Sequence, residues 1–178
     1  PSNLNSIITN KIKNGILITN IDLYFNDNLK IDNFIARGEV KEMNASINEK
    51  LAFNNTSFNF FSDNTNVLIK DIKSQTDGFL IEKGNVQLEK NEKIIVKSDF
   101  STAIKINKSN EYIKYFKNFD VKNKKINLLG KINHNLNITF DSTFKVVDFI
   151  YEGKGRIDDF NIELEEPFKN VLLQNNIN

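Results

Sequence analysis

The feature that most constrains the fold is a strict alternation of apolar and polar residues between positions 126 and 140. Every second position is apolar, apart from one glycine and one histidine: Ile126, Leu128, Gly130, Ile132, His134, Leu136, Ile138 and Phe140. The intervening positions are mostly Asn, Lys and Thr. Successive side chains of a β-strand point to opposite faces of a sheet, so this run predicts a strand with one apolar and one wet face. Such strands are typical of antiparallel sheets that are covered on one side only.

Shorter alternating runs occur along most of the chain, and turn-forming residues separate them. Asn, Asp, Ser, Thr, Lys, Glu or Gly make plausible turns at residues 26–28, 62–64, 76–78, 90–92 and 152–153. Successive strands that are joined by short turns form hairpins and meanders. The sequence therefore predicts a mainly β fold, in which a long antiparallel twisted meander forms a groove, or β-taco.

One segment, residues 109–118, breaks the period of two. Its apolar side chains recur at helical spacing, Ser109 can cap the first turn, and Glu111 lies within that turn. We expect one short helix near 109–118. Two roles are open for it: a plug that packs on the end of a sheet, or a helix that binds a partner.

A weak internal repeat accompanies the strands. Gly38, Gly84 and Gly130 are each followed by a residue and then a β-branched residue, and they lie 46 residues apart. Gly155 continues the pattern at a shorter spacing. This pattern indicates a repeated hairpin unit, and a glycine within a strand marks a bulge or a bend.

Composition excludes several functional classes. The net charge is +1, with 24 basic and 23 acidic residues, whereas a nucleic-acid-binding domain needs a basic excess. The chain has no Cys, so disulfides, thiolate zinc sites and cysteine nucleophiles are excluded. The sequence contains no phosphate-binding loop and no metalloprotease or serine-hydrolase motif, and we expect neither a cofactor nor a metal. About one residue in six is Asn, which we attribute to an AT-rich genome.

Two groups of residues remain candidates for chemistry. His134, the one histidine, lies in phase with the apolar face of its strand, where it is either a titrating group near a ligand or a turn or interface residue. Carboxylates gather in one stretch, which leaves a hydrolase as the weakest alternative: Asp158, Asp159, Glu163, Glu165 and Glu166. Glu163 and Glu165 alternate with apolar residues and therefore read as the wet face of a strand. We expect no enzymatic activity and no catalytic residue.

A sheet with one apolar face must cover that face. Burying one Phe or Ile side chain is worth roughly 1.5–3 kcal/mol, so exposing some twenty of them would exceed the stability of an ordinary domain, about 5–15 kcal/mol. The cover is either protein, in a closed β-sandwich or solenoid with a structural or adhesive role, or lipid, in an open groove.

The arrangement of these runs resembles the AsmA-like family of bacterial envelope proteins, especially its YhdP-type members, with TamB as a more distant relative. The resemblance rests on the alternating stretch 14–25, on the glycine lines around residues 38 and 130, on the expected helix, and on the stretch 155–162. It covers roughly residues 11–166. It implies a large protein, anchored in the inner membrane and projecting into the periplasm, whose β-groove carries phospholipid toward the outer membrane.

We therefore expect residues 1–178 to be a single all-β segment of a larger, repeating β-groove protein. Its partners would be phospholipid, neighbouring segments of the same chain, and a membrane reached through an anchor outside this sequence. Acyl chains would lie along a stripe of alternating apolar residues: Ile21, Leu23, Phe25, Phe58, Phe60, Val86, Leu88, Ile104, Ile106, Leu128, Ile132, Ile138 and Phe140.

Overall fold

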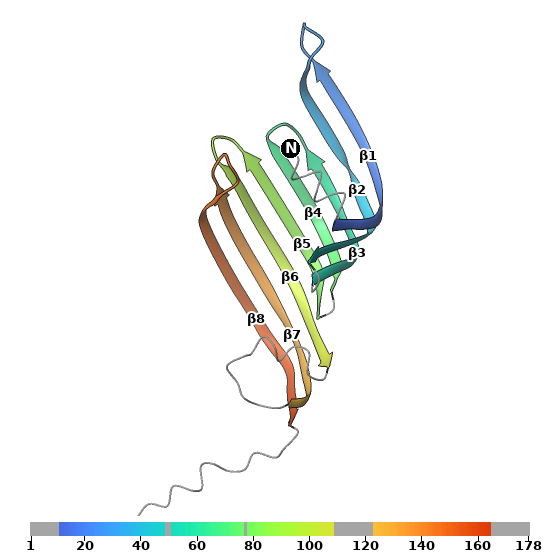
Figure 1. Ribbon diagram of the computed structural model, residues 1–178, viewed down its shortest axis with the longest axis vertical. Coiled ribbons are helices and arrows are strands. Elements are labelled where there is room, and N and C mark those ends of the chain that lie inside the picture. The colour runs from blue at the N-terminus through green and yellow to red at the C-terminus, as the bar shows by residue number, and fades with distance from the viewer. Residues whose placement is uncertain (1–10, 49–50, 77, 109–122, 165–178) are drawn as a thin grey trace, which may run out of the picture.

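The computed structural model describes residues 11–48, 51–76, 78–108 and 123–164, which form one antiparallel sheet (Figure 1). Its eight strands follow one another in chain order: β1 (Ile12–Phe25), β2 (Ile31–Asn48), β3 (Leu51–Ser62), β4 (Asn66–Gln75), β5 (Phe79–Lys90), β6 (Ile94–Lys108), β7 (Asn123–Phe140) and β8 (Val146–Leu164). The predicted mainly β, twisted meander is confirmed. The helix expected near 109–118 lies outside the described residues.

The sheet is open. Every strand pairs only with its neighbours in the chain, so β1 and β8 are its two edges, and they lie on opposite sides of Figure 1. Within the described ranges no second sheet packs against it, so these strands do not form the closed sandwich that was the alternative. The expected hairpin repeat is not regular, because Gly38 on β2 and Gly84 on β5 are three strands apart whereas Gly84 and Gly130 on β7 are two apart.

Two hairpin turns share one construction. Asn26 Oδ1 accepts hydrogen bonds from the backbone N–H groups of Asn28 and Lys30, at 3.0 and 3.1 Å. Asp141 Oδ1 does the same for Thr143 and Lys145, at 2.8 and 3.0 Å. Each turn also has one residue with positive φ, Leu29 or Phe144. An Asn or Asp side chain that mimics a backbone turn explains why these residues begin the hairpins.

A line of bulges crosses neighbouring strands. Glu42 on β2, Asn55 on β3 and Asp71 on β4 have φ values of 54°, 49° and 56°, in the left-handed region, and the register shifts beside each of them. A bulge adds an unpaired residue to one strand, which bends that strand and increases its twist. The aligned bulges account for the bend of the β1–β4 part of the sheet (Figure 1).

The described residues contain almost no buried hydrophobic core. Only Ala45, Ile81 and Ile94 are buried apolar residues among them, and no large side chain is fully buried. Most apolar side chains at the centre of the sheet are half-buried, and no second layer of described strands packs over them. No described helix is of a length and hydrophobicity that would carry it through a membrane.

Candidate binding face

The strand register defines two faces of the sheet. On the face we call the apolar face, Phe60 on β3 pairs with Ile69, Ile69 with Val86, and Val86 with Ser98. On each strand the residues in phase with these belong to the same face as far as the next bulge, where the phase shifts, and the alternate positions form the polar face.

All thirteen residues expected to line the groove lie on the apolar face. Register partners show this: Ile106 pairs with Leu128, and Ile94 pairs with Phe140. Leu88 pairs with Val96, which in turn pairs with Ile138. Toward the β1 edge of the same face, Phe60 pairs with Gly38, and Gly38 pairs with Thr19. Ile21 and Leu23 are in phase with Thr19 on β1. The register therefore brings residues from β1, β3, β5, β6 and β7 onto one continuous surface.

The apolar face also contains residues that were not expected, and β8 supplies three of the six named here. They include Leu17, Val40, Phe100, Phe149, Ile157 and Phe160. The turn expected at residues 152–153 is wrong, since Glu152 and Gly153 lie in the middle of β8 and pair with Asn135 and His134. Glycines at alternate positions conceal the period there, because Gly153 and Gly155 stand where apolar side chains would reveal a strand.

Exposed apolar side chains concentrate on the two edge strands. Of the 19 large hydrophobic residues that are exposed among the described residues, 15 lie on β1 or β8. They lie on both faces of these strands: Leu17 and Phe149 are on the apolar face, whereas Ile18 and Ile150 are on the polar face. An edge strand offers unpaired backbone groups to another strand, and apolar side chains beside them favour such pairing.

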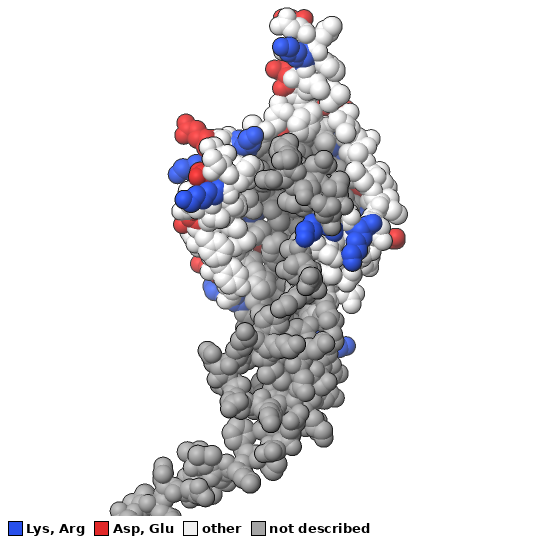
Figure 2. Space-filling view, in the orientation of Figure 1, with Lys and Arg blue, Asp and Glu red and all other residues white. Residues whose placement is uncertain are grey.

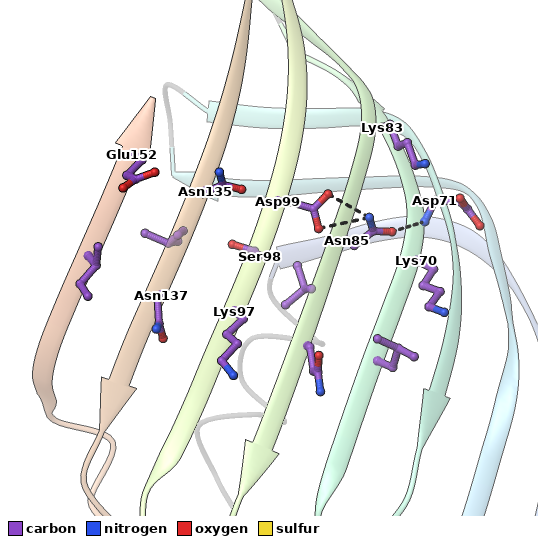
Figure 3. Close-up of a pocket in the computed structure, with 15 residues that line it drawn as sticks. Lys70, Asp71, Lys83, Asn85, Lys97, Ser98, Asp99, Asn135, Asn137 and Glu152 are labelled. Carbon is purple, nitrogen blue, oxygen red and sulfur yellow. Dashed lines mark hydrogen bonds between the residues drawn. The ribbon is translucent and has the colours of Figure 1, made fainter. Parts of the chain in front are cut away.

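The polar face is charged but electrically balanced. A shallow depression of 680 Å³ crosses β4–β8 on this face, and its lining includes Lys70, Lys83, Lys97, Asp71, Asp99 and Glu152 (Figure 3). Asn85 lies between two strands there: its Oδ1 accepts from the Asp71 N–H at 3.3 Å and its Nδ2 donates to Asp99 at 3.0 Å. Figure 2 shows charged side chains of both signs along the flanks of the molecule. This surface has no basic excess of the kind that nucleic acid requires.

The carboxylates that suggested a hydrolase are held by neighbouring side chains. Asp158 Oδ1 lies 2.9 Å from Arg156 Nε, and Asp159 Oδ2 accepts a hydrogen bond from Asn127 Nδ2 at 2.7 Å. The side chains of residues 163–166 lie outside the described part. Within that part, no group of three or more His, Asp or Glu side chains could hold a metal ion.

His134 lies in the middle of β7 and takes part in a hydrogen-bonded chain across three strands. Its Nε2 is 2.8 Å from Thr102 Oγ1 on β6, and its Nδ1 is 2.8 Å from Tyr151 Oη on β8. All three residues belong to the apolar face, so His134 is neither at a turn nor isolated. No Asp, Glu, Lys or Arg with a described side chain is paired on this face between β6, β7 and β8.

A depression of 460 Å³ lies beside this chain on the apolar face. Its lining consists of Ile104, Leu128, Gly130, Ile132, Tyr151, Gly153, Gly155, Arg156 and Ile157. The three glycines leave bare backbone at its floor, and the isoleucines and the leucine form apolar walls. The guanidinium of Arg156 is paired with Asp158. The depression therefore combines hydrocarbon walls with two polar groups, the neutral Tyr151 hydroxyl and the ion-paired Arg156 guanidinium.

Comparisons of this chain with protein-family models, with characterised protein sequences and with solved structures gave no match.

Proposed function

We propose that this chain is a non-enzymatic segment of a lipid-transport bridge that holds phospholipid acyl chains along its apolar face. In keeping with the resemblance to the AsmA-like family, this bridge would stand in the periplasm, be attached to the inner membrane, and lead to the outer membrane. Transport along it would be passive, with acyl chains on the apolar stripe and head groups in water.

One observation carries the proposal. Thirteen apolar residues, chosen from their alternation alone, lie on one face of a sheet that no other described strand covers. A half-exposed apolar surface of this extent is stabilised by contact with hydrocarbon, since apolar burial contributes about 25 cal/mol per Å². Acyl chains supply that contact without a hydrogen-bonding requirement. The half-buried state of Leu128, Ile132 and Ile138 supports this role, because their outer surfaces remain available.

The edges suggest how the segment joins its neighbours. Among the described strands, β1 and β8 each pair on one side only, so a preceding or following hairpin can extend the sheet at either edge by antiparallel pairing. Such pairing would cover the exposed side chains of β1 and β8 and continue the apolar face. We propose that the partners at both edges are neighbouring segments of the same protein.

Native mass spectrometry of the purified chain tests the proposal. We expect bound phospholipid, and we expect Leu128→Asp combined with Ile138→Asp to remove most of it. The matched control is Asn133→Asp combined with Asn135→Asp, which adds two charges to the polar face of the same strand. Equal lipid loading in the two double variants would contradict the proposal.

A further inference from the structure

The apolar face carries one polar feature that acyl chains alone do not require. Thr102, His134 and Tyr151 form a hydrogen-bonded chain on an otherwise apolar surface of β6, β7 and β8. Thr102 is 8% exposed and Tyr151 is 52% exposed, so the chain leads from a buried hydroxyl to an open one. A polar group in apolar surroundings is costly unless it is hydrogen-bonded, which makes the outer end of this chain a defined binding position.

The hydrogen bonds of Thr102, His134 and Tyr151 can point in either of two directions, because a neutral imidazole can carry its proton on either nitrogen. If Nε2 carries it, Thr102 accepts that proton and donates its own to the carbonyl of Ile132, 3.3 Å away, while Tyr151 donates to Nδ1. If Nδ1 carries it, Thr102 donates to Nε2, His134 donates to Tyr151 Oη, and the Tyr151 proton becomes free. In the second direction each bond polarises the next, so Tyr151 presents a strengthened donor to the apolar face.

Gly153 makes this arrangement possible. It follows Tyr151 by two residues on the same face and pairs with His134. A Cβ at position 153 would lie 2.7 Å from Tyr151 Oη and 3.2 Å from its Cζ, so the phenol ring lies across the glycine. The absence of a side chain at 153 therefore lets Tyr151 lie along the sheet and reach His134. Covering an edge glycine with an aromatic ring is also a known way to stabilise a sheet, and the experiment below separates the two roles.

The neutral donor and its surroundings indicate the ligand. Among the described residues, Arg156 is the one charged residue that lines the depression, and its guanidinium is already paired with Asp158, which disfavours a phosphate or a carboxylate at the hydroxyl. Hydrocarbon walls of Ile104, Leu128 and Ile157 stand beside it. A group that combines an uncharged acceptor oxygen with an attached alkyl chain is an acyl ester.

We infer that Tyr151, positioned by His134 over Gly153, donates a hydrogen bond to an ester carbonyl of a diacyl phospholipid whose acyl chain occupies the adjacent depression. This inference rests on the proposed function and assigns the polar part of the lipid to one place along the face. The phospholipid would thus have a preferred position between β7 and β8.

The test is a competition between two lipids that differ only in the carbonyl. The full chain is incubated with vesicles containing equal amounts of dioleoyl phosphatidylcholine and its diether analogue, then separated, and the bound lipids are quantified by mass spectrometry. A single hydrogen bond of ordinary strength predicts that the ester lipid is enriched about two- to tenfold on the wild-type chain.

Three variants make the readout specific. Tyr151→Phe and Gly153→Ala should bring the ester-to-ether ratio close to one, because the first removes the donor hydroxyl and the second displaces it. Tyr24→Phe is the matched control, because Tyr24 is 49% exposed on the polar face of the opposite edge strand, and it should keep the enrichment. Equal binding of both lipids by the wild type, or enrichment that persists in Tyr151→Phe, would overturn this inference alone. Binding of neither lipid would overturn the proposed function as well.

Discussion

The ring of Phe100 on β6 lies against the backbone of Gly84 on β5. The two residues are register partners, and a Cβ at position 84 would stand 2.4 Å from Phe100 Cδ1 and 2.7 Å from Cε1. Ile72 of β4 lies on the other side, 3.4 Å from the same point. Because Gly84 has no side chain, the Phe100 ring can pack at the centre of the apolar face, across β4, β5 and β6.

Gly84→Ala should destabilise the sheet, because Phe100 would be forced out of this place. Overpacking of this kind costs about 1–3 kcal/mol. The loss of unfolding free energy is measured by urea unfolding, monitored by circular dichroism. Gly153→Ala is the control, since its new methyl group meets only the tip of the Tyr151 side chain, which can move. A Gly84→Ala variant as stable as Gly153→Ala would contradict this packing.

Asn85 should hold the bulge of β4 in place. Its side chain connects the N–H of Asp71, the bulge residue with φ of 56°, to the carboxylate of Asp99 (Figure 3). Asn85→Ala removes both interactions and should cost about 1 kcal/mol of unfolding free energy. Asn135→Ala, on the same face, has no side-chain hydrogen bond to lose within the described residues. Equal unfolding midpoints for the two variants would show that the bulge does not depend on Asn85.

Acid should loosen two turns. Hydrogen bonds from Thr143 and from the backbone N–H of Lys145 lower the pKa of Asp141 below its ordinary 3.8. Hydrogen bonds from the backbone N–H groups of Thr65 and Asn66 similarly lower the pKa of Asp63. A depressed folded-state pKa contributes stability above pH 3.8 that is lost as the pH falls through the folded-state value.

The wild type should therefore be more stable than Asp141→Ala at pH 6, and the difference should shrink once the pH is well below 3.8. Thermal unfolding of both chains across this range provides the measurement. A difference that is independent of pH would mean that the Asp141 charge plays no part in the turn.

The edge strands β1 and β8 of separate molecules should associate. We expect the isolated chain to form concentration-dependent oligomers, because β1 and β8 expose apolar side chains beside unpaired backbone groups. Ile150→Lys places a charge on the β8 edge and should shift sedimentation toward the monomer. Leu80→Lys, at a similarly exposed position on the interior strand β5, should not. The same sedimentation for both variants would argue against edge pairing.

The sequence was most informative where alternation was unbroken. The run from 126 to 140 predicted β7 and its faces because a period of two leaves each side chain only one orientation. Bulges at Glu42, Asn55 and Asp71 could not be predicted, since non-glycine residues with positive φ leave no compositional signal. Each bulge also shifts the phase of the residues after it, which is why faces could be assigned only within short runs.

The faces of β8, and the hydrogen bonds that join Thr102, His134 and Tyr151, could not be predicted from the sequence. Gly153 resembles a turn residue in the sequence, yet it lies in an edge strand beneath Tyr151. His134 could be placed in phase with the apolar face, but its partners Thr102 and Tyr151 are 32 and 17 residues away in the chain. Only the register of three strands brings them together.

Two adjacent phenylalanines on β3 test directly which face of the sheet touches lipid. Phe60 lies on the apolar face, paired with Ile69, and Phe61 lies on the polar face, paired with Leu68. Each is replaced in turn by the photoreactive analogue benzoylphenylalanine, and the chain is irradiated in the presence of phosphatidylcholine vesicles. We predict a phospholipid adduct in the mass spectrum of the chain labelled at position 60 and little or none at position 61. Equal adducts at both positions, or an adduct only at 61, would contradict it.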